Sequence, residues 1–179
     1  MSKPKIATDW LAACAGCHMS LLDMDERLLQ VLSLAELTSC PITDLKHPPH
    51  EGVEVGVLTG AVNSTTNIAV ARMMRKRCKI LVALGDCAVF GGIVNMRNYF
   101  DMQEALRCAY VETPSTVDGF VPASEELGRP VRARGVDQVV KVDVCLPGCP
   151  PSADAIFHVL SELAQGRIPV VAGETLKYD

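Results

Sequence analysis

The sequence predicts an open, mostly parallel α/β sheet with helices on both faces, and two observations support this. Short apolar stretches of strand length alternate with longer segments whose apolar residues recur at helical spacing. One apolar stretch, 79–84, is apolar at nearly every position, as a strand covered on both faces should be. The 179 residues suit one domain of ordinary size, so we treat residues 1–179 as a single domain.

The first half of the chain contains three predicted strands and two predicted helices. The strands are expected at 5–11, 53–58 and 79–84, and the helices at 23–37 and 64–77. The first helix opens with acidic residues and the second closes with several cations, which are the charges that each helix end favours.

The second half continues the alternation after one interruption. A helix is expected at 101–110, a strand at 139–144 and a helix at 151–165, followed by a short strand at 168–172. Between them, 112–137 holds three prolines and three glycines with little periodicity. Irregular excursions of this length inside a compact domain usually have a functional or partner-contacting role.

Composition and charge exclude some classes of protein. Hydrophobic residues make up 49% and charged residues 21% of the chain, which is typical of a folded protein. The net charge of −4 argues against binding to nucleic acid or an anionic membrane. A mean hydropathy of +0.21 is high for such a chain. It indicates either apolar surface reserved for partner subunits or simply a well-buried core.

The expected compartment is the cytoplasm. The first residues contain no apolar run typical of a signal peptide, and no stretch reaches the roughly 18 apolar residues that a membrane helix requires. In the reducing cytoplasm the eight cysteines are more often metal ligands, catalytic groups or core residues than disulfides.

Four cysteines follow predicted strands. Cys14 and Cys17 come after the first strand, Cys87 after the third and Cys149 after the fourth. Because the carboxyl ends of parallel strands meet at one edge of the sheet, these thiols should converge there. Four thiolates are the usual ligands of a [4Fe–4S] cluster, so we predict one such cluster, held by these four residues.

The residues beside these cysteines suit a cluster. Gly16, Gly85 and Gly148 each lie within two positions of a predicted ligand, and glycine lets the backbone approach a bulky cluster closely. Pro150 directly follows Cys149 and favours the start of a helix there.

The remaining cysteines are interpreted differently. Cys40, Cys78 and Cys108 are expected to be small core residues or incidental. Cys145 lies four positions before Cys149 at the same strand end and competes with it as the fourth ligand.

Other chemistries use part of the same pattern. The run 14–18, Cys-Ala-Gly-Cys-His, matches the attachment motif of c-type haem, and its first four residues match a thioredoxin-like dithiol. Structural zinc is a third alternative, although it usually takes two close cysteine pairs. The haem and the dithiol leave Cys87 and Cys149 unexplained, and zinc does not suit one cysteine pair with two single cysteines. His18 is interpreted as a helix-start or surface residue, with a contact behind the ligands or at an interface as the alternative.

The turn at 59–67 is rich in hydroxyl and amide side chains that could face a phosphate. Capping of the following helix by Asn63 or Ser64 explains it more simply. No dinucleotide or Walker A glycine motif occurs, so nucleotide binding by this chain is not expected.

Three motifs resemble one family of proteins, the small subunits of [NiFe]-hydrogenases. They are 14–23 (Cys-Ala-Gly-Cys-His-Met-Ser-Leu-Leu-Asp), 85–92 (Gly-Asp-Cys-Ala-Val-Phe-Gly-Gly) and 146–151 (Leu-Pro-Gly-Cys-Pro-Pro). The first is especially similar to the small subunits of soluble, NAD-reducing (bidirectional) hydrogenases.

The resemblance implies a flavodoxin-like fold in which Cys14, Cys17, Cys87 and Cys149 hold the cluster proximal to the nickel–iron centre. That centre belongs to a large subunit, where hydrogen is split. Electrons would pass through this chain toward a diaphorase module of flavoprotein and iron–sulfur subunits. The resemblance neither requires nor excludes a flavin, FMN, on this chain.

The chain also departs from the family pattern. Thr59 stands where many relatives carry a glutamate, which argues against a proton-handling role at that turn. A second, cysteine-rich domain is not expected, since the chain stops at residue 179. The related cluster subunit of respiratory complex I usually has adjacent cysteines, whereas two residues separate Cys14 and Cys17, which favours a hydrogenase over that relative. A complex I-like or other cofactor-reducing [NiFe]-hydrogenase electron-transfer subunit is the alternative interpretation.

Overall fold

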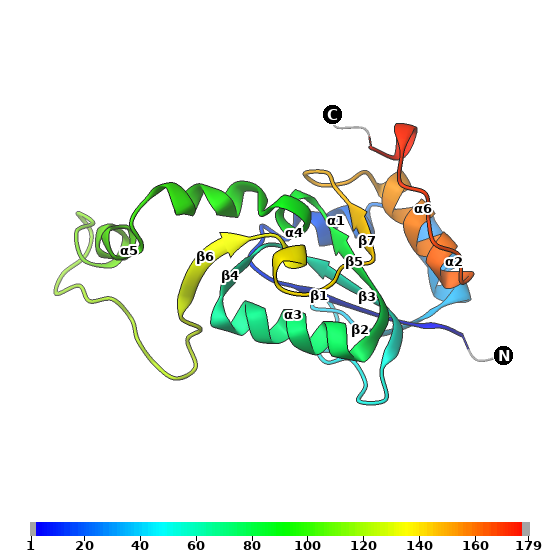
Figure 1. Ribbon diagram of the computed structural model, residues 1–179, viewed down its shortest axis with the longest axis horizontal. Helices are drawn as coiled ribbons and strands as arrows, with labels where there is room; N and C mark the ends of the chain where they lie inside the picture. The colour runs from blue at the N-terminus through cyan, green and yellow to red at the C-terminus, as the bar shows by residue number, and fades with distance from the viewer. Residues whose placement is uncertain (1–2, 177–179) are drawn as a thin grey trace.

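The structure, a computed structural model, describes residues 3–176 and is organised around a five-stranded sheet (Figure 1). Within these residues the strands run in the order β2-β1-β3-β5-β7, and neighbouring strands are parallel. This is the strand order of flavodoxin-like, doubly wound folds, so the predicted fold class is confirmed. The strands are β1 (Lys5–Trp10), β2 (Glu36–Ser39), β3 (Val53–Thr59), β5 (Cys78–Leu84) and β7 (Val144–Leu146).

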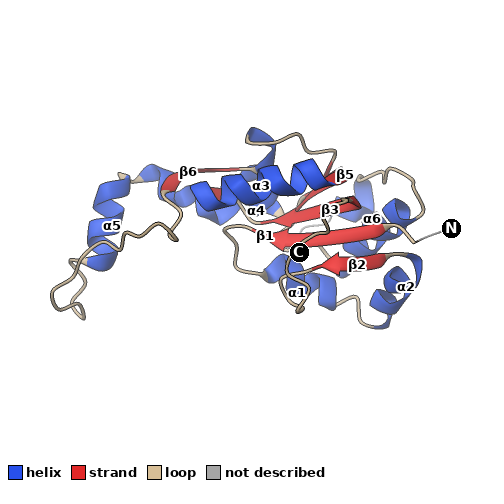
Figure 2. Ribbon diagram, turned by 90° about the horizontal axis from the view of Figure 1, so that it is seen from below, coloured by secondary structure: helices blue, strands red, loops and turns tan. Residues whose placement is uncertain are grey.

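Helices cover both faces of this sheet (Figure 2). The helices α1 (Gly16–Leu22), α2 (Glu26–Leu34) and α6 (Ala153–Ala164) cover one face, and α3 (Thr65–Arg77) and α4 (Asp86–Phe90) cover the other. A further helix, α5 (Met102–Tyr110), lies away from the sheet. On one face α1, α2 and α6 bury side chains such as Leu160 against Val57 of β3. On the other face α3 and α4 bury side chains such as Met74 against Leu58 and Leu81. Burying a side chain of this size contributes about 1.5–3 kcal/mol relative to leaving it exposed.

A second, smaller part of the chain extends beyond the main sheet. β4 (Val62–Ser64) pairs antiparallel with β6 (Pro130–Arg134). The 3-10 helix η1 (Gly92–Tyr99) leads into α5, and both figures show α5 and the loop after it lying away from the sheet. Two further 3-10 helices are η2 (Val136–Gln138) and η3 (Gly173–Leu176). We call residues 92–129 the apolar arm.

The helix ends follow from local chemistry. The Ser64 hydroxyl accepts a hydrogen bond from the Asn67 N–H at 3.2 Å, and Ser152 caps α6 in the same way through Ala155. The capping interpretation of the 59–67 turn is therefore confirmed. Gly166 follows the end of α6 at a φ of +76°, a conformation that favours glycine.

The helix predicted at 23–37 forms over a shorter range, since α2 covers Glu26–Leu34. It begins after Asp25, whose φ of +51° is not helical, and β2 begins at Glu36. The apolar spacing made the predicted helix too long because Met24 and Ala35, which flank α2, are buried in the same core as Val31.

Three predictions in the second half also need correction. The strand predicted at 139–144 is displaced, since β7 covers Val144–Leu146. The apolar run before it packs as irregular chain onto the α3 face. The excursion 112–137 contains strand β6, whose Pro130 and arginines hide its strand character. The strand predicted at 168–172 does not form, and Ile168 and Val170 are exposed.

No helix in the described part of the chain, 3–176, combines the length and the apolar character needed to cross a membrane.

Candidate functional site

Four cysteines from separate parts of the chain line one cavity at the carboxyl edge of the main sheet. They are the predicted residues Cys14, Cys17, Cys87 and Cys149. The other residues that line this cavity are Ala13, Gly16, Asp86, Gly148 and Pro150. Cys145, the competing candidate, is not among the lining residues. The structure therefore brings the predicted thiols together, while their role as ligands stays a prediction.

The first two thiols are carried by the turn between β1 and α1. The backbone of that turn is fixed to the end of β3, because the Leu11 N–H donates to the Thr59 carbonyl at 2.8 Å and Ala12 forms a two-hydrogen-bond bridge with Ala61. Ala15 then adopts a φ of +66°, which is uncommon for a residue other than glycine. This turn directs both thiols toward the other loops.

Two glycines leave room for sulfur atoms. A Cβ atom on Gly85 would lie 2.3 Å from the Cys17 Sγ, and one on Gly92 would lie 2.7 Å from the Cys87 Sγ. Both glycines have positive φ angles, +89° and +47°. A side chain at either position would therefore collide with a thiol that lines the cavity.

Burial raises the pKa values of two cavity thiols, and backbone N–H groups oppose this shift at one of them. Burial, with smaller contributions from the neighbouring thiols, raises the pKa of Cys17 to about 12 in the absence of a bound metal. Burial also raises the pKa of Cys87, while backbone N–H groups of Ile93 and Val94 act against the shift. The Gly16 N–H donates to the Cys14 Sγ at 3.4 Å. Such N–H groups are the donors that stabilise a thiolate or a cluster sulfur.

The cysteines differ in exposure. Cys14 and Cys149 are exposed, Cys17 is half-buried and Cys87 is buried, so the cavity lies close to the surface. The exposure of the three cysteines interpreted as core or incidental agrees with that interpretation. Cys40 and Cys78 are buried, while Cys108 is exposed on α5 and lines no part of the thiol cavity.

The thiol-bearing helix α1 is anchored by buried hydrogen bonds. His18 lies in the first turn of α1, as expected of a helix-start residue, but it is only 1% exposed, so its interpretation as a surface residue is wrong. Its ring nitrogens lie 3.2 Å from the Thr8 hydroxyl and 3.1 Å from the Thr59 hydroxyl, and burial lowers its pKa to about 4. The Ser20 hydroxyl donates to the Pro151 carbonyl at 2.6 Å. These contacts connect α1 to β1, to β3 and to the loop that carries Cys149.

The donor set fits a cluster better than a single ion. Among the described residues, no three His, Cys, Asp or Glu side chains lie close enough to hold one metal ion. A cubane cluster needs a wider set, because each of its four thiolates binds a different iron atom. Four thiols around one cavity, with backbone N–H groups beside the sulfurs, match that requirement.

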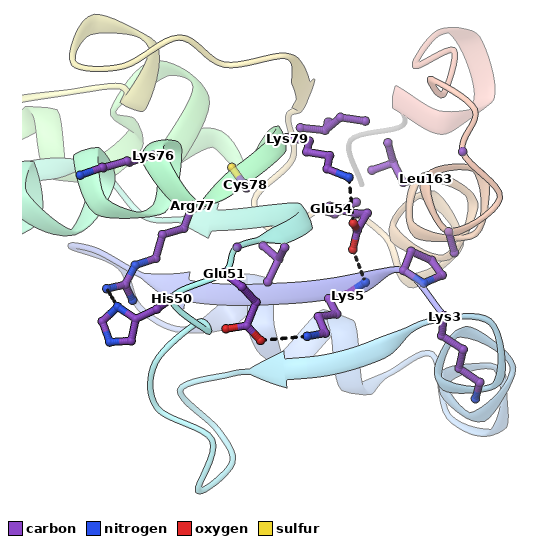
Figure 3. Close-up of a pocket in the computed structure, with 17 residues that line it drawn as sticks. Lys3, Lys5, His50, Glu51, Glu54, Lys76, Arg77, Cys78, Lys79 and Leu163 are labelled. Atoms are coloured by element: carbon purple, nitrogen blue, oxygen red, sulfur yellow. Dashed lines mark hydrogen bonds and ion pairs between the residues drawn. The ribbon is translucent and has the colours of Figure 1, made fainter. Parts of the chain in front are cut away.

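A larger groove of about 710 Å³ lies at the opposite edge of the sheet, where the strands begin (Figure 3). It is rich in cations, and several of them already have partners. Lys5 binds Glu51 at 3.1 Å, Lys79 binds Glu54 at 3.0 Å, and Arg77 donates to a backbone carbonyl. Cations here also complement the carboxyl end of α3. We therefore assign no ligand to this groove.

Sequence reasoning assigned no role to Ser20 or Asp86, and for His18 it only left a contact behind the ligands open. Asp86 directly precedes Cys87, and this adjacency was the one available signal. The roles of the other two depend on contacts with residues far away in the chain, which no local pattern reveals.

Comparison with known proteins places these features in a family. Residues 14–163 match the family model of the NADH ubiquinone oxidoreductase, 20 Kd subunit. The chain is 40% identical to the delta subunit of the NAD-reducing hydrogenase HoxS of Cupriavidus necator, over 99% of this chain and 86% of that one. It is also 34% identical to one chain of the F420-non-reducing hydrogenase of Methanothermobacter marburgensis, over 92% of this chain and 54% of that one.

Solved structures agree with these relatives. The fold matches a chain in a crystal structure of an NAD⁺-reducing [NiFe]-hydrogenase in its H₂-reduced state. The TM-score is 0.93 and the identity 34%, over 99% of this chain and 100% of that one. A [NiFeSe] hydrogenase from Desulfovibrio vulgaris Hildenborough, 16% identical with a TM-score of 0.54 over 93% of this chain and 64% of that one, shares the fold. The chain therefore belongs to the NADH ubiquinone oxidoreductase 20 Kd subunit family, and within it resembles the small subunits of [NiFe]-hydrogenases.

Proposed function

We propose that this chain, as one unit of residues 1–179, is the electron-transfer small subunit of a cytoplasmic, NAD-reducing [NiFe]-hydrogenase. It holds one [4Fe–4S] cluster through Cys14, Cys17, Cys87 and Cys149. The observation that carries the proposal is the meeting of these four thiols at one cavity. The relatives whose names specify NAD-reducing hydrogenases support the choice of reaction.

When bound, such a cluster supplies one-electron transfer, with a potential that its surroundings set. The chain's own residues fix its position and limit its contact with water. The turn after β1 holds two of the thiols, and the glycines at 85 and 92 let the backbone pass close to the sulfurs. No residue of this chain is assigned to hydrogen splitting, which we place on a nickel–iron centre in a large subunit.

The apolar arm supports a large partner. Within it Tyr99 is 87% exposed, Val117 86% and Phe120 75%. Exposed apolar side chains that gather along one segment are typical of an interaction surface. The arm begins at Gly92, next to Cys87, so a partner covering it would also close the cavity from solvent. Diaphorase subunits that carry flavin and iron–sulfur clusters would then exchange electrons with this chain, and no flavin is assigned to the chain itself.

Metal and sulfide analysis tests the cluster. The purified protein should contain about four iron atoms and four acid-labile sulfides per chain. Cys87→Ser and Cys149→Ser should lose the cluster and the hydrogen-dependent reduction of NAD⁺, while Cys108→Ser, on the exposed face of α5, should retain both. If Cys149→Ser keeps a full cluster and Cys145→Ser loses it, the fourth ligand is Cys145 and the assignment is wrong.

The electron acceptor is tested separately. Relatives that belong to F420-non-reducing hydrogenases make another cofactor-reducing enzyme the alternative. Copurification of a large subunit with nickel and a flavoprotein that reduces NAD⁺ supports the proposed acceptor. A complete cluster in a complex that reduces a different acceptor, and not NAD⁺, would contradict it.

A further inference from the structure

Asp86 connects two of the loops that carry thiols. Its backbone N–H donates to the Gly148 carbonyl at 2.8 Å, and its carboxylate Oδ1 accepts from the Gly148 N–H at 2.8 Å. The Gly85 N–H also donates to the Leu146 carbonyl at 2.8 Å. These bonds continue the pairing of β5 with β7 beyond the strand ends. The Cys87 loop and the Cys149 loop are thereby held against each other.

We propose that Asp86 is a positioning residue that fixes Cys87 and Cys149 relative to each other, and that its carboxylate charge lowers the reduction potential of the cluster. The inference rests on the proposed function, since it concerns a cluster held by these thiols. It adds an electrostatic role that the ligand assignment alone does not contain.

The hydrogen-bond part follows from the geometry of Gly148. Its N–H lies in a buried part of the loop and donates to the Asp86 carboxylate, so this side chain satisfies a backbone donor. Removing the acceptor would leave that N–H without this partner, which costs free energy and loosens the loop. Because the loop carries Cys149, a looser loop would hold the thiol less firmly.

The charge part follows from position. Asp86 lines the same cavity as the four thiols and is half-buried there. Reduction adds a negative charge to the cluster, and a nearby carboxylate opposes it, more strongly in a partly desolvated site.

Two substitutions separate the two roles. Asp86→Asn removes the charge, but its amide oxygen can still accept from the Gly148 N–H. Asp86→Ala removes both. Glu51→Gln is the matched control, because it removes an exposed carboxylate at the opposite edge of the sheet. Each variant is prepared as the assembled holoenzyme, and iron, sulfide and a redox titration monitored by electron paramagnetic resonance are measured.

Asp86→Asn should retain iron and sulfide and shift the cluster's equilibrium toward the reduced form by about tenfold, which is about 59 mV for a one-electron couple. Glu51→Gln should leave the titration unchanged. Asp86→Ala should lose at least about half of its iron during purification, as expected when a buried donor loses its acceptor.

Each of two results would refute one of the two proposed roles of Asp86. An Asp86→Asn titration identical to that of the Glu51→Gln protein removes the electrostatic role. Full iron in Asp86→Ala removes the positioning role. Wild-type protein without iron and sulfide would reject the proposed function together with this inference, whereas an intact wild-type cluster with unshifted variants rejects only the inference.

Discussion

Replacing Gly85 by alanine should disrupt the thiol site, because the added Cβ atom would collide with the Cys17 sulfur. Gly85 has a φ of +89° and a ψ of 159°, a region of backbone conformation that is essentially restricted to glycine. A Cβ atom there would lie 2.3 Å from the Cys17 Sγ, far inside van der Waals contact. The Cys17 side chain must therefore rotate away or the backbone must move.

The expected magnitude has two parts. The backbone conformation costs about 1–3 kcal/mol for a residue with a side chain. The collision adds to this cost and is relieved most easily by moving the Cys17 thiol out of the cavity, since a side chain yields before a strand end does. We therefore expect the variant to lose at least about 1–3 kcal/mol of stability and most of its iron.

Gly166→Ala is the matched control for the backbone term. Gly166 also has a positive φ, +76°, but nothing lies within 4 Å of the position its Cβ would take. This variant should lose about 1–2 kcal/mol and keep its cluster. Urea unfolding measures the stability of both variants, and iron and sulfide analysis measures the cluster. If Gly85→Ala holds as much iron as Gly166→Ala, the close approach of Gly85 to the sulfur does not matter and the reasoning fails.

Three further outcomes are expected. The folded protein keeps His18 neutral with a pKa near 4, whereas unfolded histidine titrates near 6.5, so the unfolded state binds more protons between these values. The contribution of neutral, buried His18 to stability should be fully present above pH 6.5 and should fall by about 3 kcal/mol as the pH drops toward 4. Urea unfolding across this pH range measures it. A His18→Gln protein with the same pH dependence would contradict the assignment. Met74→Ala, at a fully buried position, should cost about 2–5 kcal/mol in the same assay with an unchanged denaturant slope, and a loss below about 1 kcal/mol would show that the core refills the space. Phe120→Asp in the apolar arm should weaken copurification of the large subunit without changing the iron content, whereas undiminished copurification would show that the partner lies elsewhere.

The sequence predicted helices and strands most accurately where a long run of regular apolar spacing agreed with the signals at its ends. β3, α3 and β5 were predicted to within a residue or two, because each combines a long apolar or amphipathic run with clear end signals. The helix at 23–37 was predicted too long, because the backbone of Asp25 is not helical although the apolar spacing continues across it. β6 was not predicted because it is a short strand that begins with Pro130 and forms only by pairing with β4, which is distant in the sequence.

The thiols show the same division between local pattern and contact. Each predicted ligand lies directly after a strand, which the local sequence indicates, so their gathering at one sheet edge could be expected. The strand signal did not separate Cys145 from Cys149, since both follow the predicted strand at 139–144. The structure places Cys145 within the strand and Cys149 in the loop beyond it, and only Cys149 of the two lines the cavity.

The amino-acid order alone determined the alternation of strands and helices, the parallel sheet and the glycine-flanked thiols at its carboxyl edge. The tertiary structure alone decided how those thiols are held. The hydrogen bonds of His18 to Thr8 and Thr59, of Ser20 to Pro151 and of Asp86 to Gly148 mostly join residues that are far apart in the chain. Such bonds depend on which strands become neighbours, and strand order is set by the packing of the whole core and not by any local pattern.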